Sequence, residues 1–318
     1  MRNLVVILAT LFVLPIPATC LSSQFFITLG PEVRYVNGHS TYHISFDSPW
    51  ASGGHGESEL EFPLDNFMAG IHVMAGTRHE TGGTRTGGRL RMSLLGVVDK
   101  DAGIMKDSDW IENDAALPGG VAHEGRDLYT ESDARLRGTI FDIKYAYNFR
   151  CDQSWTLGPM LGFRYHQFKY DIYGYRGIYW TTPVYGEGKV LEYEVTYKIP
   201  YIGVTGEGLI GDKHQFRFVW SFGYSNWTQV RDRDDHILRY KLSEGECEGK
   251  SYLINVGLDW NFLPQWILSV GAEYVDIDTT GKQHQRFYAG PSAGTTYDVD
   301  DRISSSLLSG MVTVLYEF

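Results

Sequence analysis

Long stretches of strict alternation between apolar and polar residues dominate this sequence. In the segment 191–199, Leu, Tyr, Val, Tyr and Ile occupy the odd positions, and polar residues occupy the even positions. The segments 139–149, 216–224 and 252–262 follow the same period. Successive side chains of a strand point to opposite faces, so this period predicts strands with one apolar face. A run of about ten such residues is long enough for a tilted strand to cross a bilayer.

The N-terminal segment has the features of a secretory signal peptide. Arg2 precedes the apolar run 4–14, which is too short to cross a membrane as a helix. Small residues around Ala18 predict cleavage near Cys20. We therefore expect residues 1–20 to be a signal peptide and residues 21–318 to form one barrel domain. Lipidation of Cys20 and a buried N-terminal strand are the alternatives.

Composition narrows the class of protein further. Aromatic residues make up 14% of the 318 residues, which argues against disorder. Hydrophobic residues make up only 43%, too few for a bundle of membrane-spanning helices. The formal net charge of -11 argues against nucleic acid as a partner, because binding to phosphates needs a basic surface.

The alternating runs predict ten strands, joined by connections of two kinds. The connections 151–154, 211–214 and 263–265 are tight, whereas 45–57, 99–133, 173–189, 232–249 and 281–300 are long and polar. Outer-membrane barrels combine short periplasmic turns with long outer loops. We therefore predict an all-β fold, a ten-stranded antiparallel transmembrane β-barrel with long extracellular loops, in a cell outer membrane. The expected strands are 24–44, 58–78, 88–98, 134–150, 155–172, 190–209, 215–231, 250–263, 266–280 and 301–318.

Two short acidic patterns in the expected outer loops could carry chemistry. Asp107 and Asp109 stand two apart, and so do Asp234 and His236, so each pair shares a face of extended backbone. Paired carboxylates can hold a proton between them, and an aspartate beside a histidine orients the ring. Such a set could activate a water molecule, although acidic loops are more often simply solvated. The spacing matches no recognisable calcium or zinc motif, so no metal is predicted.

Three blocks of sequence resemble the omptins, outer-membrane endopeptidases of Gram-negative bacteria. The blocks are KDSDWIEND at 106–114, PYIGVTGE at 200–207 and RDRDDH at 231–236. The resemblance implies an aspartic-type endopeptidase that needs no cofactor. His236 would be the general base, Asp234 its orienting partner, and Asp107 and Asp109 the acids that position the attacking water. The alternative is a non-enzymatic outer-membrane barrel, either a structural protein or an adhesin.

The resemblance also implies how substrates bind. Asp232 matches an acidic residue that receives a basic P1 side chain, and Tyr42 replaces a second acidic residue, which predicts a looser preference. Glu131 aligns with a further acidic subsite residue. Substrates would be peptides or protein segments, drawn as cations to the acidic segment 99–133. Lipopolysaccharide is the implied activating lipid, with Arg164 and Lys169 as candidate contacts, and a monomer is favoured.

Two further expectations concern single residues. Neighbouring aspartates stabilise an imidazolium, which predicts a pKa of His236 above about 6.5. Cys151 in a periplasmic turn and Cys247 in an outer loop would lie too far apart to pair. Both cysteines should therefore be free thiols, with Cys247 the one reached from outside the cell.

Overall fold

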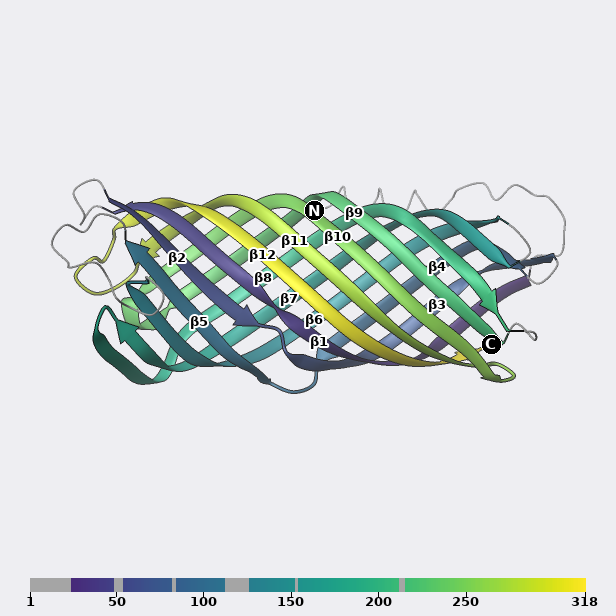
Figure 1. Ribbon diagram of the computed structural model, residues 1–318. Helices are drawn as coiled ribbons and strands as arrows, with labels where there is room; N and C mark the ends of the chain where they lie inside the picture. Colours follow the sequence, from purple (N-terminus) through teal and green to yellow (C-terminus); the bar gives the residue numbers. More distant parts are fainter. Residues whose placement is uncertain (1–23, 49–53, 82–83, 112–125, 152–153, 212–214) are drawn as a thin grey trace.

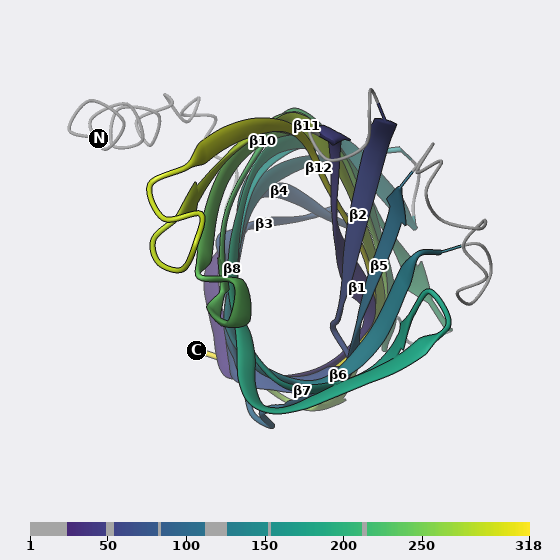
Figure 2. The same ribbon diagram turned by 90° about the vertical axis from the view of Figure 1, so that its left-hand side faces the viewer.

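A closed sheet of antiparallel strands forms the whole described molecule. The computed structural model describes residues 24–48, 54–81, 84–111, 126–151, 154–211 and 215–318. The sheet closes because the last strand pairs with the first, and Figure 2 shows the resulting ring end-on. Its twelve strands (Figure 1) are β1 (Gln24–Ser48), β2 (Gly54–Pro63), β3 (Asn66–Thr81), β4 (Thr84–Val97), β5 (Asp101–Ile111), β6 (Leu128–Arg150), β7 (Trp155–Tyr179), β8 (Thr182–Ile210), β9 (Phe216–His236), β10 (Lys241–Leu263), β11 (Trp266–Phe287) and β12 (Thr296–Glu317).

The prediction of ten strands is not confirmed, because the expected strand 58–78 is divided into β2 and β3, and β5 forms within the expected loop 99–133. β3 and β2 lie end to end along β1, and β4 and β5 lie end to end along β6. Pro63 ends β2, as expected for a residue that has no N–H to donate to the ladder. The side chain of Asn66 joins the two interruptions by donating to the backbone oxygens of Asp99 and Asp101, at 2.7 and 3.0 Å.

The outer surface changes character along the barrel. Large apolar side chains are exposed on the half of the barrel in which β12 ends. Among them are Phe25, Leu29, Leu94, Tyr147, Trp155, Ile202, Phe222, Ile254, Trp260, Val270 and Val312. On β9 this band ends at Trp227, and Arg231 and Arg233 follow on the same face. Beyond the band, Arg231 pairs with Glu246 at 2.9 Å, and Lys282 pairs with Asp300. The strands therefore continue past the apolar band as a polar extension. No helix in the described ranges is long and apolar enough to cross a membrane.

Most of the expected outer loops are strand, which corrects the predicted boundaries. β1 has 25 residues, roughly 80 Å of extended chain, whereas crossing a membrane takes only about 10 residues. At the outer end, β7 and β8 are joined by Trp180 and Thr181 alone. The sequence pattern stops where polar residues appear on both faces, but the backbone hydrogen bonds continue. The predicted signal peptide, with Cys20, lies outside the described residues.

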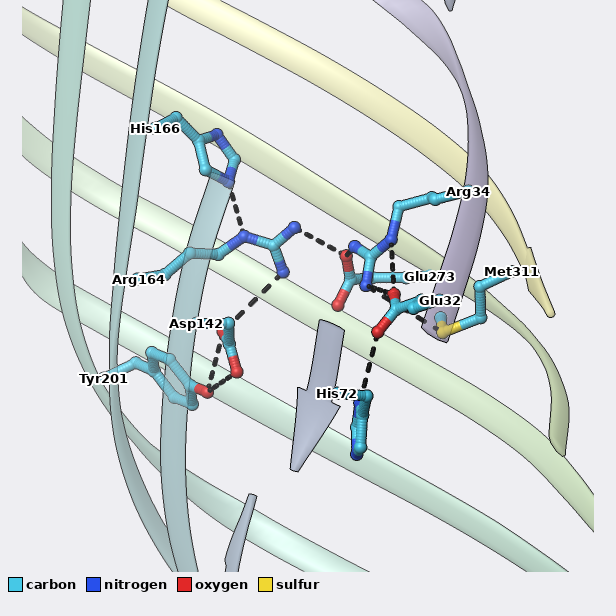
Figure 3. A network of polar contacts seen from close by, with 9 residues as sticks. All are labelled: Glu32, Arg34, His72, Asp142, Arg164, His166, Tyr201, Glu273 and Met311. Carbon is cyan, nitrogen blue, oxygen red and sulfur yellow. Dashed lines mark hydrogen bonds and ion pairs between the residues drawn. The ribbon is translucent and has the colours of Figure 1, made fainter. Parts of the chain in front are cut away.

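Within the apolar band, ion pairs fill the lumen (Figure 3). Arg34 on β1 donates to Glu273 on β11 at 2.5 Å and to Glu32 at 2.7 Å. Arg164 on β7 donates to the same Glu273 oxygen at 2.6 Å. All four side chains are buried. The predicted contact of Arg164 with lipid phosphate is therefore wrong, since alternation turns that side chain inward. The second candidate, Lys169, is half-exposed and pairs with Glu194 at 2.9 Å.

Towards the outer end, the lumen is filled by apolar side chains instead. Phe62 stacks on Tyr193 with ring centroids 4.1 Å apart, and Tyr170 and Phe168 are buried beside them. This aromatic core closes the barrel beneath its outer mouth. The residues that line the mouth therefore rest on closely packed side chains.

The cysteines follow the prediction only in part. Both described cysteines are free thiols, Cys151 exposed and Cys247 buried. The expectation that Cys247 is accessible from outside is wrong, because the residue lies on β10 with its side chain turned into the barrel.

Candidate active site

The acidic pairs identified in the sequence meet in one cleft at the outer mouth of the barrel. Asp107 and Asp109 lie on β5, and Asp234 and His236 lie at the end of β9. Strand alternation turns each pair inward. Two adjoining cavities form the cleft, and Asp107, Asp109 and His236 line both of them. These residues lie on strands rather than in loops, and they stand between the two halves of the cleft.

The two halves of the cleft are built by different strands. One half lies against β5 to β8 and is largely apolar, with Met105, Leu128, Tyr175, Tyr179, Val190 and Leu191. The other half lies against β1, β2 and β10 to β12, with Tyr42, Ile44, Phe46, Gln285, Phe287 and Val299. An extended peptide could therefore lie across the carboxylates with side chains in both halves.

Asp234 holds the histidine from behind. Its Oδ2 lies 2.9 Å from Nε2 of His236, and its side chain is 0% exposed, against 13% for His236. Asp234 lines neither half of the cleft, so it contacts the ring without reaching a substrate. A ring whose Nε2–H is directed at Asp234 has Nδ1 as its basic nitrogen. The pair thus has the arrangement of a general base and its orienting carboxylate.

The site lies in the polar extension beyond the apolar band, and burial sets its proton affinities. Burial lowers the pKa of His236 below its usual value, although Asp234 acts in the opposite direction. The prediction of a raised pKa is therefore wrong, because loss of hydration outweighs the neighbouring charge. Burial, with the repulsion of Asp109, raises the pKa of Asp107 to about 7. A neutral imidazole and a protonated carboxyl can thus exist together near neutral pH.

Two cations in the site were not found from the sequence. Arg239, in the short 3-10 turn Ile237–Arg239, lines both halves of the cleft, and Lys241 at the start of β10 lines one. Lys241 is buried, which lowers its pKa, while Asp234, Asp109 and Asp107 act to raise it. These cations offset the charge of the carboxylates. Arg239 and Lys241 follow His236 by three and five residues, and this spacing does not predict where their side chains point. The 3-10 turn sets that direction.

Of the expected substrate-binding residues, two lie near the cleft and one does not. Tyr42 lines the cleft, and its hydroxyl donates to Oε1 of Gln283 at 2.7 Å. Asp232 lies behind this wall, where its Oδ2 accepts from Gln283 at 3.4 Å. Glu131 sits on the opposite face of β6 from Thr130, which lines the cleft, and accepts from Tyr129 at 2.9 Å. Alternation therefore separates Glu131 from the cleft.

Within the described ranges, no group of three or more histidine, cysteine, aspartate or glutamate residues is arranged to hold a metal ion. The carboxyl groups and the imidazole that line the cleft are suited to acid–base chemistry on a water molecule.

The fold and the cleft together define an outer-membrane β-barrel with an acidic site at its outer mouth. The omptin family profile matches residues 90–291, so this chain belongs to the omptin family. The crystal structure of outer membrane protease OmpT from Escherichia coli matches with a TM-score of 0.72 and 15% identity, covering 94% of this chain and 99% of that one. This likeness supports the fold.

Relatives with curated names are more similar in sequence over shorter segments. Outer membrane protease OmpP of Escherichia coli strain K12 is 28% identical over 164 residues, 49% of each chain. The plasminogen activator of Yersinia pestis is 24% identical over 166 residues, again 49% of each. The chain therefore matches about half the length of these relatives.

Proposed function

We propose that this chain is an aspartic-type endopeptidase that hydrolyses peptide bonds in its outer cleft. The observation that carries the proposal is the meeting of Asp107 and Asp109 with a histidine supported by Asp234, at the centre of an open cleft. The names of two relatives, outer membrane protease and plasminogen activator, agree with it. We place the cleft on the extracellular side of the outer membrane.

The proton affinities of the site suggest how the steps divide among its residues. Neutral His236 takes a proton from water while the water oxygen attacks the scissile carbonyl carbon. The protonated carboxyl of the Asp107–Asp109 pair donates its proton to the carbonyl oxygen, which gives a neutral tetrahedral intermediate. The imidazolium then protonates the leaving nitrogen, the C–N bond breaks, and the carboxylate recovers its proton from the hydroxyl group. Each group thus returns to its starting state.

The charges near the site favour cationic peptides as substrates. Arg239 and Lys241 offset the carboxylates at the centre, and Asp298 adds a further carboxyl group to the same half of the cleft. A polypeptide would need an unfolded segment to lie across the cleft, because the aromatic core closes the barrel below. We therefore propose peptides and flexible protein segments with basic residues near the cleaved bond.

Hydrolysis by the purified, refolded chain tests the function directly. A quenched fluorescent peptide with several basic residues should be cut at internal bonds, and mass spectrometry should locate them. In H₂¹⁸O, one labelled oxygen should enter the new carboxyl group during a single turnover, without a trapped acyl-enzyme. His236→Ala should abolish cleavage while the barrel stays folded on a gel without boiling. Cleavage by His236→Ala within a few-fold of the parent chain would refute the mechanism and favour a structural or adhesive barrel.

Lipopolysaccharide as an activating lipid and a monomeric state also stay proposals. The lumen position of Arg164 removes one of the two contacts first expected. Activity measured in detergent with and without added lipopolysaccharide, alongside the mass of the complex by light scattering, tests both.

A further inference from the structure

Two buried carboxyl groups converge behind the wall of the cleft. Asp232 comes from β9 and Asp301 from β12, strands that do not pair with each other. A methyl group at Gly245 of β10 would meet Asp232 Oδ1 at 2.2 Å and Asp301 Oδ2 at 2.6 Å. Both oxygens therefore face the same small space above Gly245.

Hydrogen bonds within the chain satisfy this pair only in part, with backbone N–H groups of Gly245 and Arg302 contacting Asp232 and Asp301. Asp232 is 5% exposed and Asp301 is 3% exposed. Oδ1 of each accepts no hydrogen bond from the described residues, and neither acid forms an ion pair there. Oδ2 of Asp301 lies 3.4 Å from Sγ of Cys247, a weak donor. Each acid thus keeps an oxygen that could accept a hydrogen bond from a cation, which would allow the buried acid to be charged.

Among the described residues, the titratable groups that act most strongly on the pair are acidic or neutral. The titratable groups that face it are Tyr42 of β1, Tyr193 and Tyr197 of β8, Asp234 of β9 and Cys247 of β10. Burial raises the pKa of Asp232 well above its usual value and that of Asp301 to about 7. In the empty site the acids therefore hold protons that an incoming cation would displace.

Neutral side chains connect the pair with the cleft. Gln285 and Tyr42 line the cleft, and both donate to Oε1 of Gln283, at 2.8 and 2.7 Å. The amide of Gln283 in turn lies 3.4 Å from Oδ2 of Asp232. No ion pair needs to break for Tyr42 and Gln283 to turn aside. A long cationic side chain in this half of the cleft could then reach both acids.

We propose that Asp301 is a specificity residue: with Asp232 it forms a subsite for the cationic side chain of a peptide substrate. The inference rests on the proposed peptidase function and extends it. The sequence assigned only one carboxyl group to this pocket, since Tyr42 stands where a second acid was expected. Asp301 of β12 supplies the second acid instead. The preference for basic residues should therefore be strict rather than loose.

Matched peptides measure the role of the added charge. Two quenched peptides identical except for arginine or its neutral isostere citrulline at the cleaved bond give a ratio of kcat/KM. A third peptide with lysine at that position separates guanidinium from ammonium recognition. Asp301→Asn should lower the arginine-to-citrulline ratio about tenfold to a hundredfold, as expected for losing one charge-assisted contact. Asp300→Asn is the control, because Asp300 pairs with Lys282 on the outer face and should leave the ratio within about twofold.

A binding measurement separates failure of the subsite from failure of the function. Calorimetric titration of the refolded full chain with benzamidine should show binding that Asp301→Asn weakens tenfold or more. If no peptide is cut but this binding pattern appears, the peptidase is refuted and the subsite stands. An unchanged ratio in a folded Asp301→Asn barrel, or benzamidine binding that does not depend on Asp301, would overturn the subsite.

Discussion

Replacing Asp234 by asparagine removes one charge from behind the histidine and changes the shape of the site least. Asp234 is 0% exposed and lies 2.9 Å from Nε2 of His236. The substitution keeps the volume of the side chain. It replaces the charged acceptor by a neutral amide whose NH₂ group can donate to the ring, so the ring is free to adopt the other tautomer or to turn.

The size of the effect follows from this geometry. A hydrogen bond to a charged group is worth about 1.5–3 kcal/mol, which alone lowers the rate about tenfold to a hundredfold. Because Asp234 is fully buried, water does not screen the contact, so the upper end applies. Loss of the correct tautomer adds to this, and the matching change in a serine protease triad costs about 10⁴ in kcat. We therefore expect kcat to fall by about 10³ or more, with little change in KM.

The assay is steady-state hydrolysis of a basic quenched peptide by the refolded variant, with the shift in gel mobility on boiling as the test of folding. Asp235→Asn is the matched control. Asp235 is the next residue on β9, faces outward and accepts from Tyr288 at 3.0 Å, so its loss should change kcat less than about twofold. A folded Asp234→Asn variant with kcat within tenfold of the parent chain would refute the role given to this contact.

Further predictions concern pH, stability and accessibility. Catalysis needs neutral His236 and a proton on the Asp107 pair, so kcat/KM should fall below a pH that lies under about 6.5 and again above about 7. A rate that stays level from pH 7 to 9 would exclude the protonated acid. Glu273→Gln breaks a buried ion network and should lower the free energy of unfolding in urea by about 3–5 kcal/mol, whereas a loss under about 1 kcal/mol would show that the lumen relaxes. A maleimide should label Cys151 in the folded protein in detergent and Cys247 only after unfolding, and rapid labelling of Cys247 in the folded chain would contradict its burial.

The polar extension of the barrel supports the site with paired strands instead of loops. The acids and the histidine stand on paired strands whose neighbours fix them on both sides, since Asp234 lies between Tyr193 on β8 and Ser243 on β10. A loop would hold the four groups less firmly. Reaction steps that depend on close geometry gain from this support.

Alternation along the chain determined the class of fold by itself. A period of two leaves one face apolar, and a run of such segments around a polar interior can be satisfied only by a closed barrel in lipid. The same alternation placed Asp107 with Asp109, and Asp234 with His236, on common faces. These features depend on residues two apart, so they are readable from sequence.

What the sequence could not determine depends on contacts between distant strands. The sequence pattern predicted strand ends where the outer face becomes polar. The strands continue there, but alternation between apolar and polar side chains no longer reveals them. The sequence assigned Glu131 to the site and missed Lys241, whose burial comes from the strands around it. It also missed that Asp301 meets Asp232, since the two acids come from unpaired strands, β9 and β12, and share the space that Gly245 of β10 leaves open. Local spacing fixes the face that a side chain occupies, but only closure of the sheet decides which side chains that face meets.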